Sequence, residues 1–316
     1  MKRTLRRSIV APTAWIRARR KEPTMRKVVL LLAVGAALGA PGVANADTGC
    51  PPDSVKVGTA CIDLYEASVW SIPAANTNLI AKVQAGTATL ADLTGDGATQ
   101  LNPAYLSFPC SSNYPANFPS DGNWTPILGS SPPSPGVYAV SVAGVLPSTC
   151  TTWFQAVQAC AVSGKRLVRN EEWQRAAAGT PDPGTDNGTT DCNISTADHP
   201  VNTGSRANCK SSWGVFDMVG NVGEWVADWA DQAQNCTDWT TQTGIPGGDI
   251  ICFGDFGAGR AQVSHPGSHG IPAALIRGGQ SVLSIGFAGS SAGVFSVDGL
   301  FFPSDFFPVL GFRCAR

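Results

Sequence analysis

The fold of this chain is decided by the stretch Trp213-Gly214-Val215-Phe216-Asp217-Met218-Val219-Gly220-Asn221-Val222-Gly223-Glu224-Trp225-Val226-Ala227-Asp228-Trp229. Two carboxylates, Asp217 and Glu224, flank a glycine turn whose carbonyl groups can point inward. Calcium collects about six to eight oxygen ligands, and a loop of this kind can supply them. The alternative is a turn that Asp217 caps while Glu224 pairs with Arg313. The spacing alone leaves both interpretations open.

Residues 274–316 form the second informative segment. They begin with Arg277-Gly278-Gly279 and end with Gly311-Phe312-Arg313-Cys314. The residues between these blocks have no helical period and no strand-like alternation, which predicts loop, yet they are unusually apolar. Such a segment is either a buried meander or an exposed binding face.

Two helices are predicted before the glycine turn. Thr151 or Thr152 can cap a helix that continues through Cys160 and ends at Gly164. Asn170 can cap a second helix, with two glutamates in its first turn and Gly179 as its stop. Both apolar faces are typical of ordinary core packing.

The region before these helices is less regular. Residues 60–67 alternate as a short strand after a turn at Gly58. Residues 72–149 are rich in Pro, Ser, Gly and Asn and lack a sustained apolar period, so we expect a long irregular surface insertion within the domain.

The N-terminus has the pattern of an export signal. Its parts are the basic pair Arg26-Lys27, an apolar run from Val28 to Leu38, and the small-x-small site Ala44-Asn45-Ala46. The run is shorter than the ~20 residues of a membrane span. We expect residues 1–46 to be an N-terminal extension and signal peptide, which starts at Met1 or Met25. The predicted location is the periplasm, the medium or the cell surface of a bacterium-like host.

Removal of this segment changes the charge balance. Of 22 Lys+Arg, 10 lie in the first 27 residues, together with 1 of 23 Asp+Glu, which leaves 12 basic against 22 acidic residues and a net charge of −10. A chain of this charge is a poor nucleic-acid binder, because phosphate binding requires a positive field.

All ten cysteines follow the predicted cleavage site. An even count in an exported chain favours disulfides, and the absence of a Cys-x-x-Cys motif argues against zinc and thioredoxin-like sites. Cys50 and Cys61 are close enough in sequence to pair around the Gly58 turn.

The stretch at residues 213–229 resembles the loop of the formylglycine-generating enzyme (sulfatase-modifying factor) family, whose pattern is D/N-x-x-G-N-x-W-E-W. Four other blocks share the resemblance: Ile62-Asp63-Leu64-Tyr65-Glu66, Gly164-Lys165-Arg166-Leu167 followed by Glu171-Glu172-Trp173, Arg277-Gly278-Gly279, and Gly311-Phe312-Arg313. The resemblance implies one α+β, largely irregular domain over residues 47–316, with the C-type-lectin-like fold of that family and bound calcium.

The family's calcium ligands can be carried over residue by residue. They fall on the side chains of Asp217 and Glu224 and the carbonyl groups of Gly220 and Val222, and a second calcium site aligns with Asn193-Ile194. One departure lies inside the loop, because Gly223 stands where the family usually has Trp.

The resemblance also implies disulfide pairs. The family joins its helix cysteine to the cysteine that follows Gly-Phe-Arg, which corresponds to Cys160 with Cys314. The remaining neighbours then suggest Cys192 with Cys209, Cys236 with Cys252, and Cys110 with Cys150.

The catalytic cysteines of the family are absent. Its oxidases place two cysteines just after Arg-Gly-Gly, where they bind Cu(I), a metal that selects thiolates. Here those positions are Leu283 and Ala288. Ser281 and Ser284 have His265 and His269 nearby in sequence, but no third group orients a base. We therefore expect no copper and no catalytic residues.

The C-terminal segment, residues 274–316, resembles the variable region of proteins diversified by diversity-generating retroelements, several of which have this fold. The resemblance implies fixed scaffold residues between positions of arbitrary side chain. The latter would form the ligand-binding surface: Ser281, Val282, Leu283, Ser284, Ile285, Phe287, Ala288, Ser290, Leu300, Phe301, Phe302, Asp305, Phe306, Phe307, Val309 and Leu310.

The sequence therefore predicts an exported display protein that binds an unknown protein or surface ligand. Aromatic anchors on a rigid surface suit this role, because they dominate interface energies and lose little entropy on binding. One alternative is a formylglycine-generating oxidase that acts on a sulfatase cysteine, or another divergent activity of the family. The other is that the apolar residues are ordinary core in a family member of unknown role.

Overall fold

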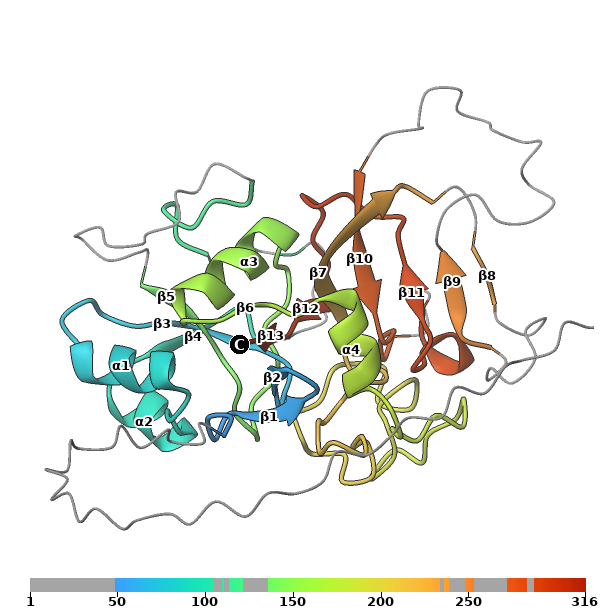
Figure 1. The fold of residues 1–316 in the computed structure, drawn as a ribbon, viewed down its shortest axis with the longest axis horizontal. Coiled ribbons are helices and arrows are strands. Elements are labelled where there is room, and N and C mark those ends of the chain that lie inside the picture. The colour runs from blue at the N-terminus through green and yellow to red at the C-terminus, as the bar shows by residue number, and fades with distance from the viewer. Residues whose placement is uncertain are drawn as a thin grey trace, which may run out of the picture. The chain divides into compact units, whose positions relative to one another are not determined.

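Strand β7 (Gly223–Asp231) begins directly after the glycine turn and belongs to the largest sheet. This sheet has six strands in the order β12-β7-β10-β11-β9-β8, most of which Figure 1 shows side by side. Within it, Glu224 lies opposite Arg277 of antiparallel β10 and Gly311 of parallel β12. The other bounds are β8 (Thr237–Asp238), β9 (Ile250–Cys252), β10 (Pro272–Arg277), β11 (Val297–Asp298) and β12 (Leu310–Phe312).

The computed structural model describes residues 49–104, 110, 114–121, 136–233, 236–238, 248–252, 272–282 and 287–316. Residues 48–316 form one compact unit. The predicted signal peptide and the predicted ligand-surface residues Leu283, Ser284 and Ile285 lie outside the described residues.

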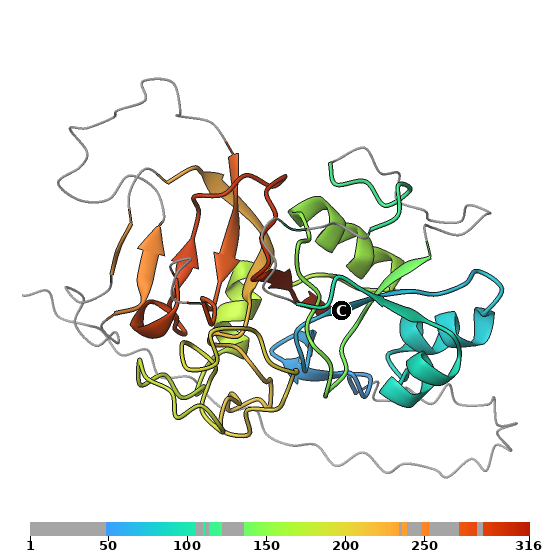
Figure 2. The same ribbon diagram turned by 180° about the vertical axis from the view of Figure 1, so that it is seen from behind.

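A four-stranded sheet contains both early and late parts of the chain. Its order is β1 (Ser54–Val57), β2 (Ala60–Asp63), β13 (Cys314–Ala315) and β6 (Arg166–Leu167). The strand expected at residues 60–67 is therefore confirmed for its first half. Figure 2, seen from behind, shows the C-terminal end beside blue and green segments from much earlier in the chain.

The two predicted helices are present and lie on opposite faces of the β7–β10 pair. Helix α3 (Trp153–Val162) is capped by Thr152, whose hydroxyl accepts from the Gln155 N–H. It packs in one core cluster with Trp225, Ile276 and Phe312. Helix α4 (Asn170–Ala176) packs in a second cluster that includes Val226 and Leu275. Each strand supplies both clusters because successive side chains point to opposite faces.

One capping prediction was wrong. Asn170 is the first helical residue of α4 and not its cap, because the preceding residue, Arg169, has the extended backbone of a cap. The Arg169 N–H donates to Glu172 Oε2 at 3.0 Å, so a glutamate of the first turn satisfies this end of the helix. The Asn170 N–H instead donates to Asp228 of β7.

The segment at residues 72–149 is more regular than its composition predicts. It contains helices α1 (Thr77–Ala85) and α2 (Leu90–Gly95) and strands β4 (Thr99–Leu101) and β5 (Val137–Val140), which form a third sheet with β3 (Ser68–Ser71). The helices bury only Leu79, Val83 and Leu93. So few apolar positions give no sustained period, and packing against Trp70 and Tyr138 stabilises the elements instead.

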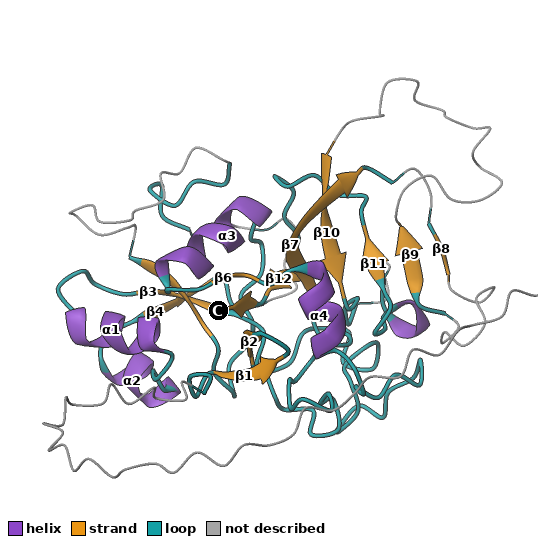
Figure 3. Cartoon of the chain, viewed as in Figure 1, coloured by secondary structure: helices purple, strands orange, loops and turns teal. Residues whose placement is uncertain are grey.

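Loops make up much of the remainder. Figure 3 shows the connection from α4 to β7 as loop, and the described residues 287–316 contain only short strands and the 3₁₀ turn Gly289–Ser291. The expected α+β, largely irregular architecture is confirmed. Among the described residues, no helix has the length and apolar character needed to cross a membrane.

All ten cysteines are paired in five disulfides, and the pairs are those that the sequence and the family resemblance suggested. They are Cys50–Cys61, Cys110–Cys150, Cys160–Cys314, Cys192–Cys209 and Cys236–Cys252. Five disulfides indicate a protein that folds outside the reducing cytoplasm.

Candidate ligand-binding site

The glycine turn before β7 is built from left-handed backbone. Asp217, Gly220 and Asn221 have φ values of 58°, 74° and 59°. Glycine is required at position 220 because a Cβ there would lie 2.2 Å from the carbonyl oxygen of Asn193. The turn therefore packs directly against the loop that carries Asn193.

Glu224 forms a buried ion pair with Arg313. Its Oε1 lies 2.6 Å from Arg313 Nη2, and Arg313 Nε donates to both carboxylate oxygens at 3.1 Å. Trp173 Nε1 donates to Oε2 at 2.6 Å. This is the ion pair of the alternative to calcium, and it joins the glycine turn to the Gly-Phe-Arg block.

Glu66 is a third buried carboxylate beside this pair, and no role was predicted for it from the sequence. It accepts hydrogen bonds from Asn221 Nδ2 at 2.5 Å and from the Val222 N–H at 3.1 Å, so it holds the turn from behind. Burial and the neighbouring Asp217 and Glu224 raise the pKa of Glu66 well above its usual range. Its place in a family-like block was the signal that could have revealed this role.

Of the predicted calcium ligands, Asn193 has a side-chain oxygen that could bind the ion, whereas Glu224 does not. Glu224 does not fit a calcium ligand as arranged, because both of its oxygens accept from Arg313 and Trp173. Asp217 is buried, accepts from the Gly204 N–H at 2.7 Å, and has a pKa raised to about 6, chiefly by burial. The predicted ligand atom of Val222 is its carbonyl oxygen, and the N–H of the same residue donates to Glu66.

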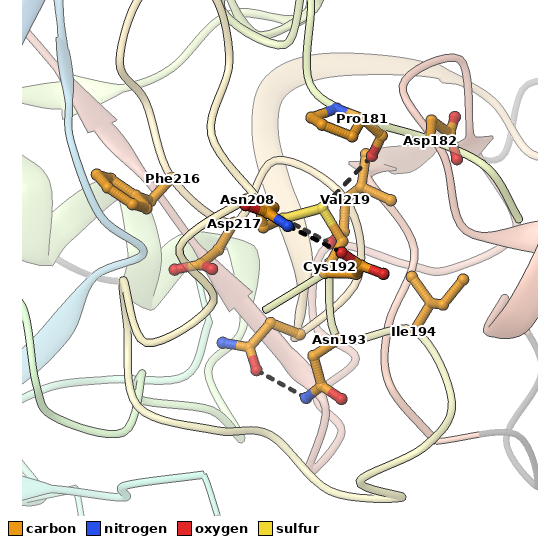
Figure 4. Close-up of a disulfide and its surroundings, with 12 residues drawn as sticks. Pro181, Asp182, Cys192, Asn193, Ile194, Asn208, Phe216, Asp217 and Val219 are labelled. Atoms are coloured by element: carbon orange, nitrogen blue, oxygen red, sulfur yellow. Dashed lines mark hydrogen bonds between the residues drawn. A yellow bond between two sulfur atoms is a disulfide. The ribbon is translucent and has the colours of Figure 1, made fainter. Parts of the chain in front are cut away.

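Asn193 retains a buried oxygen that suits a hard cation. Its Nδ2 donates to the carbonyl of His199 and to Asn221 Oδ1, whereas its Oδ1 has no partner among the described residues. In Figure 4 the carboxylate of Asp217 and the side chain of Asn193 point in different directions. No three His, Cys, Asp or Glu side chains of the described part gather as a metal site. Calcium stays a prediction.

No cysteine thiolate is available to bind copper in this structure. Every cysteine is in a disulfide, so none is a free thiolate while these bonds are intact. Ala288 is buried, and Ser281 is buried with its hydroxyl donating to the carbonyl of Asn221. Leu283 and Ser284 lie outside the described residues.

The described members of the predicted ligand surface differ in exposure. Ser290, Phe302 and Phe306 are exposed, and the two phenylalanines retain 39% and 43% of their accessible surface. The partly buried members are Phe287, Leu300, Phe301, Asp305 and Phe307. The buried members are Ser281, Val282, Ala288, Val309 and Leu310. The fully buried Ser281 side chain is thus a scaffold element and cannot contact a surface ligand as arranged.

Five members of the predicted surface line one apolar pocket. Its volume is about 480 Å³, including the part open to solvent. The segment after the Arg-Gly-Gly block contributes Phe287, Phe301, Phe307, Val309 and Leu310. The remaining lining residues, which were not predicted from the sequence as ligand-binding, are Gly223, Ile276, Gly279, Gln280, Ser296 and Asp298.

The aromatic wall of the pocket is a connected row. The ring centroids of Phe287 and Phe301 lie 6.4 Å apart, and those of Phe301 and Phe307 lie 4.8 Å apart in an edge-to-face arrangement. The carbonyl of Phe301 accepts from the Ala274 N–H of β10, and the carbonyl of Phe307 accepts from the Cys150 N–H. Backbone contacts thus hold this wall in place.

Comparison with known proteins extends these findings. Residues 117–316 match the family model described as the sulfatase-modifying factor enzyme 1-like domain. The formylglycine-generating enzyme of Thermomonospora curvata is 33% identical over 101 residues, which cover 26% of this chain and 33% of that protein.

Solved structures of one protein also align with the fold. The P3c and M1 variants of the Major Tropism Determinant are each 17% identical, with TM-scores of 0.40 and 0.41. Each alignment covers 84% of this chain and 52% of that chain. The chain thus spans about half the length of these structures and a third of the curated relative.

Proposed function

The chain belongs to the sulfatase-modifying factor enzyme 1-like family, and we propose that it is an exported, non-catalytic protein that binds a ligand at its apolar pocket. Its α+β, largely irregular structure is the C-type-lectin-like fold of that family. The family match covers residues 117–316, which include every residue that lines the pocket.

The observation that carries this proposal is the aromatic wall of the pocket. Phe287, Phe301 and Phe307 are only partly buried, although phenylalanine is among the residues most often buried in proteins. Phe302 and Phe306, their neighbours in sequence, are exposed but do not line the pocket. A concave apolar site with a partly exposed aromatic wall is typical of ligand binding, because aromatic anchors that enter pockets carry most of an interface's energy.

The rigidity of the site supports binding. Gly223, Ile276 and Leu310 lie on three adjacent strands, and the Cys160–Cys314 disulfide closes the scaffold just beyond β12. A site held in this way loses little conformational entropy when a ligand binds. The absence of free cysteines argues against the copper-dependent oxidase alternative.

Dye binding provides a direct test at the level of the protein. We expect the neutral apolar dye Nile red to bind with increased emission, and Phe301→Ala to weaken that binding several-fold because the central ring of the wall is lost. Trp213→Ala is the matched control, since Trp213 is an exposed aromatic residue that does not line the pocket. Equal dye binding by wild type and Phe301→Ala would count against the pocket.

We also propose that residues 274–316 are a variable region diversified by a retroelement, as their resemblance to such regions implies, and the encoding DNA tests this. If residues 274–316 are a variable region, a near-identical non-coding repeat of this segment lies near the gene, beside a reverse transcriptase gene. The two copies should differ mainly at adenines, in codons for side chains that reach the pocket or its rim. An isolated gene without such a repeat contradicts this part of the proposal.

Calcium is a separate proposal for the same scaffold. Two observations support it: Asn193 Oδ1 has no partner among the described residues, and all of the predicted ligand atoms are oxygens, which calcium prefers. Ligation by Glu224 additionally requires that carboxylate to exchange contacts with Arg313 or Trp173 for the ion. Calcium would then stabilise the loops beside the pocket.

A further inference from the structure

One polar side chain stands out in the apolar pocket. Asp298 is the last residue of β11 and lies directly opposite Ile276 of β10, so their side chains share one face of the sheet. Ile276 lines the pocket, and its neighbour Leu275 packs into the cluster on the other face. The register therefore directs Asp298 toward the pocket, whereas Val297 packs with α4 on the opposite face.

Asp298 has no cation beside it in the described structure. Its Oδ1 accepts from the Leu300 N–H at 2.9 Å, and no ion pair of the described residues includes it. Burial raises the pKa of Asp298 to about 7. A buried carboxyl without a counter-charge destabilises a fold, and such residues are concentrated at functional sites.

The charged groups nearest Asp298 on β10 and β7, Arg277 and Glu224, face the other way. Arg277 of β10 lies opposite Val297, stacks over the Trp173 ring at 4.7 Å, and donates to the carbonyl of Ser296. Glu224 of β7 is paired with Arg313. Strand β9 carries no ionisable side chain, because Cys252 is in a disulfide. Asp298 is thus the charged group that this part of the sheet presents to the pocket.

Gly223 lines the same pocket as Asp298, at a position where side chains pack closely against the backbone. A Cβ at position 223 would lie 3.0 Å from Ile276 Cγ2 and 3.6 Å from Leu310 Cδ1, both in pocket-lining residues. The φ angle of Gly223 is outside the left-handed region, so the backbone itself does not require glycine. A larger side chain here would push against Ile276 and Leu310 and occupy part of the pocket that these residues line.

We propose that the pocket takes a basic side chain, lysine or arginine, from a protein ligand. Its apolar stem lies against Phe301, Phe307 and Leu310, and its cationic end reaches Asp298. This inference rests on the proposed ligand-binding function and names the chemistry of the ligand. A purely apolar occupant would bury the carboxyl further without a partner, and an anionic one would be repelled, whereas a cation forms a charge-assisted hydrogen bond.

Two small probes of equal length test the inference in the full chain. Pentylamine mimics the stem and ammonium of lysine, and pentan-1-ol is its neutral counterpart. We expect wild-type protein to bind the amine about tenfold more tightly than the alcohol in a ligand-observed NMR titration. Asp298→Asn should remove this preference, with the alcohol affected less than about twofold.

Matched variants show whether an effect depends on the place of the substitution in the pocket or only on the type of residue changed. Asp182→Asn changes a partly buried carboxyl that does not line the pocket, and should leave the amine preference intact. Gly223→Leu should abolish binding of both probes, whereas Gly95→Leu, at a glycine with open space around it, should not. Circular dichroism and melting curves confirm folding, and Gly223→Ala replaces the leucine variant if that one fails to fold.

The outcomes distinguish this inference from the function on which it rests. Equal binding of amine and alcohol by the wild type, or an amine preference that survives in Asp298→Asn, overturns the basic-side-chain inference and leaves ligand binding at the pocket standing. Failure of both probes to bind folded wild-type protein, or binding unchanged by filling at position 223, contradicts the pocket itself and the proposed function with it.

Discussion

At the scale of single residues, Arg313 is the side chain on which most of the family-like blocks converge. Its guanidinium pairs with Glu224 of the glycine turn and donates to the carbonyls of Asp63 and Phe216. The guanidinium is fully buried, so each of these donors has a protein partner in place of water. The Gly-Phe-Arg block therefore stabilises two distant segments, the stretch at residues 213–229 and the block at residues 62–66.

Arg313→Met should strongly destabilise the fold. The change leaves Glu224 as a buried carboxylate without its cation, which typically costs about 3–5 kcal/mol in the free energy of unfolding. Urea denaturation measures the loss. Arg166→Met is the control, because the Arg166–Glu172 pair is much more exposed and surface pairs contribute about 1 kcal/mol or less. Equal losses in both variants would contradict the role given to Arg313.

Asp298→Asn should change how stability depends on pH. Because burial raises the folded-state pKa of Asp298 to about 7, folding favours its protonated form. The contribution to stability is full below the unfolded pKa of about 4 and is lost as pH rises through about 7. Asparagine cannot ionise, so the variant should gain stability relative to wild type between about pH 4 and pH 8. Melting curves at several pH values check this, and a constant difference would contradict it.

At the scale of elements, the sequence predicted what local rules determine. Helix α3 follows from Thr152 as a cap and apolar residues at helical spacing, and its ends agree with the structure. The elements of residues 72–149 were missed, because α1 and α2 each contribute too few apolar residues to produce a period. Helix α4 was predicted correctly, but its cap was not. The Arg169 N–H at the start of the helix donates to the side chain of Glu172, and Asn170 is not the cap.

Disulfides of different span should contribute unequally. Cys160–Cys314 closes 154 residues and Cys192–Cys209 closes 17. Loop-closure entropy in the unfolded chain then gives about 5 kcal/mol for the first and about 3 kcal/mol for the second. Paired Cys→Ala variants, compared by urea denaturation, should show the larger loss for Cys160 with Cys314. A larger loss for Cys192 with Cys209 would contradict this order.

At the scale of the whole molecule, the pocket arises from topology that no local pattern encodes. Residue Gly223 was noticeable in the sequence as a departure from the family pattern. Asp298 was not, because its place beside Ile276 depends on the pairing of β11 with β10. The apolar character of residues 300–310 was visible, but which side chains enter the interior depends on β12 pairing with β7.

Chelation tests the calcium proposal on the complete chain. If calcium binds the turn, EDTA should lower the melting temperature of wild-type protein, and Asp217→Asn should melt at the same temperature with and without EDTA. Asp182→Asn, which alters a carboxyl outside the turn, should keep the wild-type response. Identical wild-type melting curves with and without EDTA would contradict the calcium proposal, and Arg313 alone would then neutralise Glu224.

The position of β13 has a consequence for the order of events during folding. This strand, near residue 315, lies between β2 and β6, and β12 forms the edge partner of β7. Neither sheet can be completed before these last strands have been synthesised, so the chain cannot reach its native state while they are still in the ribosome. Contacts between segments this distant in sequence also make folding slow. This dependence on distant strands favours the export that we propose, because translocation across a membrane through a narrow channel requires an unfolded chain.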